Sequence, residues 1–201
     1  MTTTTTRLIL AGLGGAALAL GSGAFADQMS KGHMMAKGSM MAHNPMVGGA
    51  SMYPSKTIVD NAVNSKDHTT LVAAVKAAGL VPTLSSPGPF TVFAPTNAAF
   101  GKLPAGTVNS LVEPANKAAL TKILTYHVVA GRYTANDIAS MAAKHHGTAT
   151  LTTVEGEPLR FMKSGGGWWV MDAKGGKARI TIPNVMQSNG VIHVVDTVLM
   201  P

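Results

Sequence analysis

A histidine and an aspartate stand three residues apart near the end of the chain, in the stretch SNGVIHVVDTVLMP at residues 188–201. Such a pair belongs to a catalytic relay when the two side chains share a hydrogen bond. The valine-rich residues 191–199 predict a strand, in which successive side chains point to opposite faces. His193 then shares a face with Val195, whereas Asp196 lies on the other face, and only a bulge would bring the two together. We therefore predict that His193 is a core residue whose ring nitrogens find hydrogen-bond partners.

Other catalytic patterns are missing from the sequence. The chain has no cysteine, which excludes disulfides, thiolate zinc sites and a cysteine nucleophile. It contains no G-x-S-x-G, H-E-x-x-H, P-loop or dinucleotide-binding pattern. Glu155 and Glu157 flank Gly156, which predicts an exposed hairpin turn rather than a carboxylate pair in a cleft. The sequence predicts a protein that is not an enzyme, since a hydrolase would need a different strand register.

Methionines and histidines form a second group with possible chemistry, within residues 27–56. Part of this segment divides into three six-residue units, MSKGHM, MAKGSM and MAHNPM, each of which begins and ends with methionine. Thioether sulfur is a soft ligand that suits Cu(I), and imidazole suits copper in either oxidation state. The candidate copper ligands are Met29, His33, Met34, Met35, Met40, Met41, His43 and Met46. A flexible tether, or a methionine pool oxidised sacrificially to sulfoxide, is the alternative interpretation.

The same segment is rich in Met, Gly, Ala, Ser and Lys and has almost no branched aliphatic residues. Such a composition cannot bury enough apolar surface to offset the ordering entropy. We therefore predict that residues 27–56 are a disordered arm without a preorganised metal site.

The first residues resemble an export signal. A charged start, MTTTTTR, precedes the thirteen-residue apolar run LILAGLGGAALAL, and Ala24-Phe25-Ala26 supplies the small-x-small pattern of a cleavage site. We predict a signal peptide over residues 1–26, cleaved before Asp27. No later stretch approaches the roughly 20 apolar residues of a membrane-spanning helix, so the mature chain is expected to be periplasmic or extracellular, without a transmembrane segment.

The formal net charge is +7 at pH 7, yet the lysines and arginines are scattered singly along the sequence. Proteins that bind nucleic acid usually gather such residues into a stripe or patch. We therefore expect no nucleic-acid partner, and a solvated surface with some attraction to anionic envelope polymers.

Residues 57–201 predict a domain in which helices come first and strands follow, the order of an α+β fold. Helices are predicted over residues 57–64, 67–79, 114–125 and 134–144, with a further short helix capped by Thr96. Strands are predicted over residues 89–94, 126–129, 149–154, 159–163, 168–172, 178–183 and 191–199. In the second helix we expect Asp67 to act as the N-cap and Gly79 to end the helix.

Three motifs in this region resemble a known family. GPFTVFAPTNAAF at residues 88–100, LTYHVV at 124–129 and NGVIHVVDTVLMP at 189–201 are similar, in order and spacing, to motifs of the fasciclin domain family. The resemblance implies a wedge-shaped β-sandwich with helices packed at one side, over residues 57–201. It also implies a non-catalytic binding module of exported adhesion or extracellular matrix proteins.

Tyr126 and His127 match a Tyr-His pair that the family resemblance links to adhesion in some animal members. The alternative is a hydrogen-bonded hinge between the helix before the pair and the strand after it. Those animal members carry an Asp-Ile pair, tied to integrin recognition, where this chain has Asn184 and Val185. Because the carboxylate is missing, we do not expect that mode of recognition.

Trp168 and Trp169 lie in a predicted strand where the family usually has smaller residues. Because neighbouring strand residues face opposite ways, both rings are buried only if both faces of the sheet are covered. An exposed tryptophan can stack on sugar rings or anchor a protein partner. The candidate residues for binding a surface protein or polysaccharide are Tyr126, His127, Trp168 and Trp169.

Overall fold

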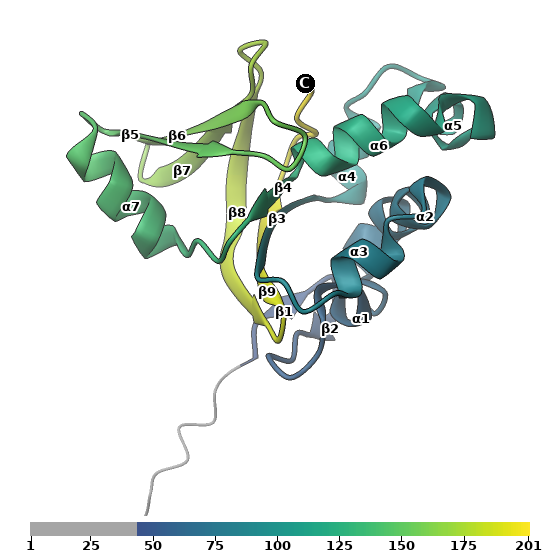
Figure 1. The fold of residues 1–201 in the computed structure, drawn as a ribbon, viewed down its shortest axis with the longest axis horizontal. Helices are drawn as coiled ribbons and strands as arrows, with labels where there is room; N and C mark the ends of the chain where they lie inside the picture. The colour runs from purple at the N-terminus through teal and green to yellow at the C-terminus, as the bar shows by residue number, and fades with distance from the viewer. Residues whose placement is uncertain (1–43) are drawn as a thin grey trace, which may run out of the picture. The chain divides into compact units, whose positions relative to one another are not determined.

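The computed structural model describes residues 44–201, which fold around one seven-stranded mixed sheet (Figure 1). The signal peptide predicted over residues 1–26, and residues 27–43 of the arm predicted over residues 27–56, lie outside the described residues. Within the described part, none of the helices has the length and apolar character needed to cross a membrane.

The order of helices and strands follows the α+β pattern. The helices are α1 Ile58–Ala62, α2 Thr69–Ala78, α3 Val81–Ser85, α4 Asn97–Gly101, α5 Thr107–Val112, α6 Lys117–Tyr126 and α7 Ala135–Lys144, with 3-10 turns η1 Lys66–His68 and η2 Pro114–Asn116. The strands are β1 Met46–Val47, β2 Ala50–Ser51, β3 Phe90–Pro95, β4 Val128–Ala130, β5 Thr148–Thr152, β6 Pro158–Ser164, β7 Gly167–Met171, β8 Lys177–Gln187 and β9 Gly190–Val195. The predicted fold class is confirmed.

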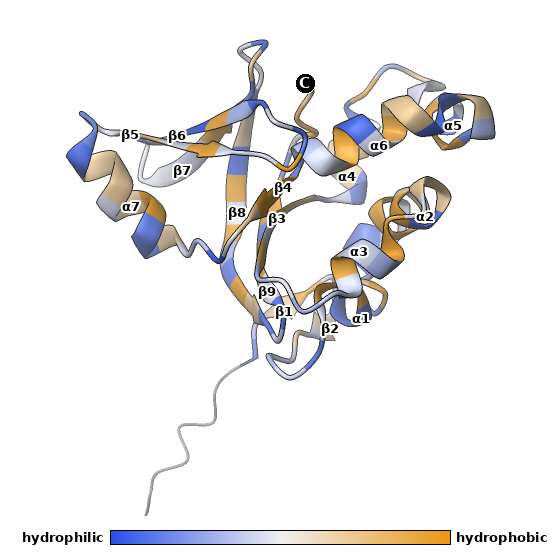
Figure 2. Cartoon of the chain, in the orientation of Figure 1, coloured by the Kyte–Doolittle hydropathy of each residue, from blue (hydrophilic) through white to orange (hydrophobic). Residues whose placement is uncertain are grey.

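The large sheet has the strand order β4-β3-β9-β8-β7-β6-β5, and only the β3–β9 pairing is parallel. The long strand β8 pairs with β7 along its first residues and with β9 from Ile180 to Gln187. Two bulges interrupt the pairing with β9, one between Ile180 and Ile182 and one between Ile182 and Val185. Hydrophobic and hydrophilic residues alternate along β8 (Figure 2). β8 therefore belongs to two layers, a first layer of β4, β3, β9 and β8 and a second layer of β8, β7, β6 and β5.

Two hydrophobic cores flank the first layer. Helices α1 to α4 and α6 pack on one of its faces, around Val92, Ile192 and Val194. The second core lies between the layers, where the Phe93 ring from β3 and the Phe161 ring from β6 have centroids 5.1 Å apart. Helix α7 packs on this second core, so the helices are not all on one side of the sheet as the family resemblance implied (Figure 1).

The helix ends follow local signals in most places. Thr57, Thr96 and Thr134 cap α1, α4 and α7 with their hydroxyl oxygens, and Gly79 ends α2 in the left-handed conformation, φ 74°. The predicted cap by Asp67 is wrong. Asn97, from α4, instead accepts the hydrogen bond of the Thr70 N–H at 3.0 Å, a contact that only the tertiary fold provides.

The predicted boundary between arm and domain at residue 57 also differs from the structure. Val47 and Met52 are 4% and 2% exposed, and β1 pairs with β2 in a small hairpin. The Lys66 N–H donates to the Gly48 carbonyl oxygen at 3.2 Å, and the Asn61 side chain bonds both backbone polar groups of Tyr53. Residues 45–56 therefore belong to the folded domain, because two buried apolar side chains outweigh the polar average composition of the segment.

The Tyr126–His127 pair lies inside the fold rather than on its surface, at 0% and 2% exposure. The His127 Nδ1–H donates to the Ile123 carbonyl oxygen at 2.8 Å, and Nε2 accepts the Leu199 N–H at 3.0 Å. The Tyr126 hydroxyl oxygen accepts the Ala173 N–H at 2.9 Å. Both residues are therefore buried and hydrogen-bonded to backbone groups, as in the alternative of a hydrogen-bonded hinge.

The N-terminal hairpin gives a first prediction. Met52→Ala should lower the free energy of unfolding by about 2–5 kcal/mol, as for other buried methionines. Met46→Ala, at a side chain that is 56% exposed in β1 of the same hairpin, should change it by less than about 0.5 kcal/mol. Urea denaturation of both variants measures the difference. If both substitutions change the free energy of unfolding by less than about 0.5 kcal/mol, the hairpin is not part of the cooperative fold.

The buried histidines give a second prediction, on pH. Burial lowers the pKa of His127 from 6.5 to about 4, and it also lowers the pKa of His68 and of His193. Because the unfolded chain takes up these protons first, stability is complete above pH 6.5 and is lost as the pH falls towards the folded-state pKa. His127 alone should cost about 2 kcal/mol between pH 7 and pH 5.

Denaturation by urea at a series of pH values measures this loss. His127→Gln should flatten the pH dependence, and His145→Ala, at an exposed histidine, should leave it unchanged. A free energy of unfolding that stays constant from pH 7 to pH 5 in the unsubstituted chain would contradict the prediction.

Candidate binding surface on the second layer

His193 and Asp196 are not partners in the structure. His193 is 0% exposed and stacks on Phe93, with ring centroids 5.5 Å apart. Its Nε2–H donates to the Tyr133 carbonyl oxygen at 2.9 Å, and Nδ1 accepts the Asn184 N–H at 3.3 Å. Both ring nitrogens are therefore occupied by backbone groups, as predicted for a core histidine, and burial lowers the pKa of the ring.

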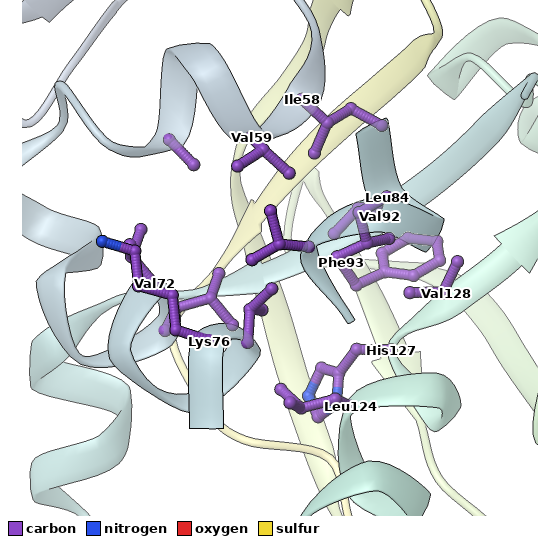
Figure 3. A pocket seen from close by; sticks show the side chains of 14 residues that line it. Ile58, Val59, Val72, Lys76, Leu84, Val92, Phe93, Leu124, His127 and Val128 are labelled. Carbon is purple, nitrogen blue, oxygen red and sulfur yellow. The ribbon is translucent and has the colours of Figure 1, made fainter. Parts of the chain in front are cut away.

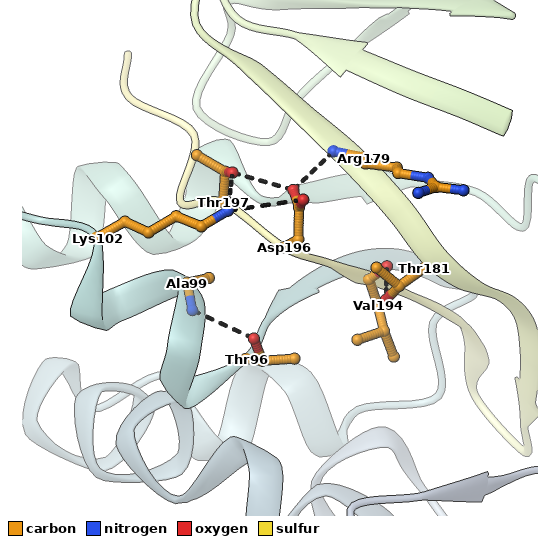
Figure 4. A network of polar contacts seen from close by, with 8 residues as sticks. All are labelled: Thr96, Ala99, Lys102, Arg179, Thr181, Val194, Asp196 and Thr197. Atoms are coloured by element: carbon orange, nitrogen blue, oxygen red, sulfur yellow. Dashed lines mark hydrogen bonds and ion pairs between the residues drawn. The ribbon is translucent and has the colours of Figure 1, made fainter. Parts of the chain in front are cut away.

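Asp196 follows the last residue of β9 and belongs to a surface network (Figure 4). Its Oδ1 accepts the Arg179 N–H at 2.9 Å and the Thr197 hydroxyl at 3.0 Å, while Lys102 Nζ lies 3.6 Å from Oδ2. Partial burial would raise the pKa of this carboxyl, but these donors together lower it. Asp196 thus ties the start of β8 to α4, and the predicted absence of a relay is confirmed.

Glu155 and Glu157 both pair with Lys122 of α6, at 3.4 Å and 3.8 Å. The Glu155 side chain is only 14% exposed, so the predicted exposed turn is partly covered. The two carboxylates share one ammonium group, as in a structural ion pair.

A small pocket opens between α1, α2, α3 and the β3–β4 part of the first layer (Figure 3). Its volume is about 40 Å³, and apolar side chains line it together with Lys76 and His127. Ligand pockets usually measure about 300–1,000 Å³ and carry convergent polar groups. Both ring nitrogens of His127 are hydrogen-bonded to backbone groups. His127 therefore provides no reactive centre in this pocket.

The predicted copper ligands fall almost wholly outside the described residues. Met46 is the exception: it lies in β1, is 56% exposed, and accepts a hydrogen bond from the Ser51 hydroxyl at 3.3 Å. Within residues 44–201, no three His, Cys, Asp or Glu side chains gather as a metal site would require.

The two tryptophans of β7 point to opposite faces of the second layer. Trp168 packs against the second core. Trp169 lies on the outer face, defined here as the face of the second layer that points away from this core. Its ring Nε1–H donates to the Ser164 carbonyl oxygen at 3.2 Å, and both side chains are half-buried. Of the four candidate partner-binding residues, Trp169 is therefore the one on a surface without a covering layer in the described part of the chain.

Strand register builds two cross-strand rows on the outer face. One row runs Thr148, Met162, Trp169, Arg179, and the other runs Thr150, Arg160, Met171, Lys177. The cations Arg160, Lys177 and Arg179 are exposed. Strands β5 to β8 contain no Asp or Glu, so this face carries only positive charge.

Arg179 lies beside Trp169 because the two residues are cross-strand partners. Its side chain reaches over Gly167, where a Cβ atom would stand 3.4 Å from the Arg179 Nε. Arg160, Met162, Met171, Lys177 and Arg179 were not candidates from the sequence. Their period-two alternation was visible, but their grouping around Trp169 depends on the pairing register.

Comparisons with known proteins agree with this architecture. A model of the Fasciclin domain matches residues 66–201. A structure of the FAS1 domain pair from the insect cell adhesion molecule Fasciclin I has a similar fold, with a TM-score of 0.64 at 20% identity, covering 73% of this chain and 51% of that one.

Similar sequences occur in bacteria and in an animal. Protein sll1483 of Synechocystis is 47% identical over 156 residues, or 78% of this chain and 79% of that protein. Immunogenic protein MPB70 of Mycobacterium bovis is 37% identical over 70% of this chain and 66% of its own. Transforming growth factor-beta-induced protein ig-h3 of Sus scrofa is 33% identical over 74% of this chain and 20% of its own length. From Lys66 to its last residue, this chain belongs to the fasciclin domain family.

Proposed function

We propose that this protein is an exported, non-catalytic binding module that acts in cell adhesion or extracellular matrix association. The observation that carries the proposal is how the polar groups are distributed. Inside the fold, the ring nitrogens of His127 and His193 are hydrogen-bonded to backbone groups. Trp169 and three cations, in contrast, lie together on the outer face. Such a face is suited to recognition.

Family membership supports the same proposal. The fold matches that of a protein described as an insect cell adhesion molecule, and a relative in Mycobacterium bovis is described as a cell surface glycolipoprotein. The export signal predicted over residues 1–26 agrees with a periplasmic or extracellular location.

An adhesion assay tests this function. Beads coated with residues 27–201 should be retained on bacterial envelope fragments at least about fivefold better than beads coated with an unrelated protein of similar pI. Beads coated with residues 44–201 should be retained equally well, because the folded domain carries the binding. Retention that disappears with residues 27–43, or that never exceeds the basic control, would overturn the proposal.

Copper binding through the N-terminal segment is the second candidate, favoured by the three methionine-bounded units at residues 29–46. Thioether and imidazole ligands suit Cu(I), and reversible oxidation to methionine sulfoxide is the competing role of the same residues. In both cases residues 29–46 would carry the function, and the fasciclin domain would serve only to support this segment.

Competition for Cu(I) against a coloured chelator distinguishes the two roles. Residues 27–201 should withdraw the metal at micromolar concentration, whereas residues 44–201, which retain only Met46 of the candidate ligands, should not. If both chains compete equally, the ligands lie elsewhere. If neither competes, copper binding is excluded, and mass spectrometry after peroxide treatment then measures sulfoxide formation.

A further inference from the structure

We propose that the outer face of the second layer is a binding site for an acidic polysaccharide, a glycan that carries carboxylate or sulfate groups. The inference rests on the proposed binding function and names the chemical class of its ligand. Three features of the face carry it: its uniform charge, a fixed aromatic ring, and the length of its two rows.

The charge of the face selects an anionic ligand. Arg160, Lys177 and Arg179 are exposed there, and the carboxylates near the ends of these strands are already engaged. Glu157, just before β6, pairs with Lys122 at 3.8 Å. Asp172 accepts hydrogen bonds from the backbone of its own turn and of Met200, and Asp196 accepts those of Arg179 and Thr197. An arriving anion therefore meets cations without competing acidic side chains.

The aromatic ring selects a ligand with sugar rings. Trp169 is held in place by its hydrogen bond to the Ser164 carbonyl oxygen and by its place between Met162 and Arg179 in the cross-strand row. A ring that is already fixed loses little conformational entropy when a ligand stacks on it. Arg179, beside it over Gly167, can bond a carboxylate or sulfate in the bidentate manner.

The length of the two rows suits a chain of rings. Neighbouring strands lie about 4.8 Å apart, so the four side chains of one row span about 14 Å across the layer. Thr148 and Thr150 of the edge strand β5 stand at the far end of the rows, where their hydroxyls can bond sugar hydroxyls. A polysaccharide can follow such a row from β8 to β5.

Other anionic partners fit the face less well. A lipid surface is bound by protruding apolar side chains, whereas Trp169, Met162 and Met171 are each half-buried. A single nucleic-acid strand is bound by several successive aromatic platforms, and the outer face carries one. The lipid surface remains an arm of the test.

Calorimetry of residues 27–201 with an oligomer of polygalacturonate tests the proposal. The matched probes are a neutral dextran of equal length, poly-L-glutamate of equal charge, and vesicles that contain phosphatidylglycerol. We expect polygalacturonate to bind at least about tenfold more tightly than any of these probes, with an affinity that falls as salt is added. Equal binding of poly-L-glutamate or of the vesicles would reduce the site to a charged surface and overturn the proposal.

Paired variants test the residues. Trp169→Ala should weaken polygalacturonate binding by about tenfold, and Arg160→Gln combined with Arg179→Gln should weaken it similarly and reduce its salt dependence. Lys163→Gln, at a cation on the opposite face of β6, is the matched control and should have little effect. If Trp169→Ala fails to fold, the double variant of Arg160 and Arg179, two exposed residues, tests the site instead.

The two tryptophans provide a second readout, because the chain contains no others. In Trp168→Phe, the emission of Trp169 should shift when polygalacturonate binds. In Trp169→Phe, the emission of Trp168 should not change. No binding of polygalacturonate, or binding that Trp169→Ala and the arginine pair leave intact, overturns the site, while retention in the bead assay would still support adhesion through another surface.

Discussion

The long strand β8, which is bulged and bent and belongs to both layers, is the constraint on which the rest of the structure depends. Asn184 lies at its second bulge with φ 59°, a left-handed conformation that asparagine tolerates better than most residues. Its N–H donates to His193 Nδ1, and its side-chain oxygen accepts the Ala135 N–H at 2.7 Å. The bulge is thereby tied to β9 and to the start of α7. The first residues of β8 pair with β7, so the same strand also carries the second layer, which packs over the first around Phe93 and Phe161. The other face of the second layer is the outer face with Trp169.

This arrangement assigns a structural role to the groups that resembled catalytic ones. His193 holds the bend, and His127 joins the end of α6 to Leu199 near the C-terminus. Each accepts one backbone N–H and donates to one carbonyl, which is the full capacity of a neutral imidazole. An imidazole in that state has no nitrogen left for a substrate proton, so recognition is left to the side chains outside the cores.

Much of this fold could be predicted from the sequence, because local signals and tertiary contacts agree there. The threonine caps, the left-handed Gly79 and the opposite faces of His193 and Asp196 follow from rules that act within a few residues. The N-terminal hairpin was missed because Val47 and Met52 are two buried side chains in a segment of polar composition. The cap by Asn97, and the rows around Trp169, arise between distant residues and depend on a register that one sequence does not reveal.

Nitrogen NMR of the histidine side chains tests the central claim most directly, because it reports the protonation of each ring nitrogen. We expect His193 to be a neutral imidazole with its proton on Nε2, and to remain neutral when the pH is lowered through 6.5, the ordinary pKa of histidine. A His193 ring that titrates at or above its ordinary pKa, or that carries its proton on Nδ1, would contradict the hydrogen bonds to Asn184 and Tyr133. The histidine would then be available for chemistry, and the bend of β8 would need another cause.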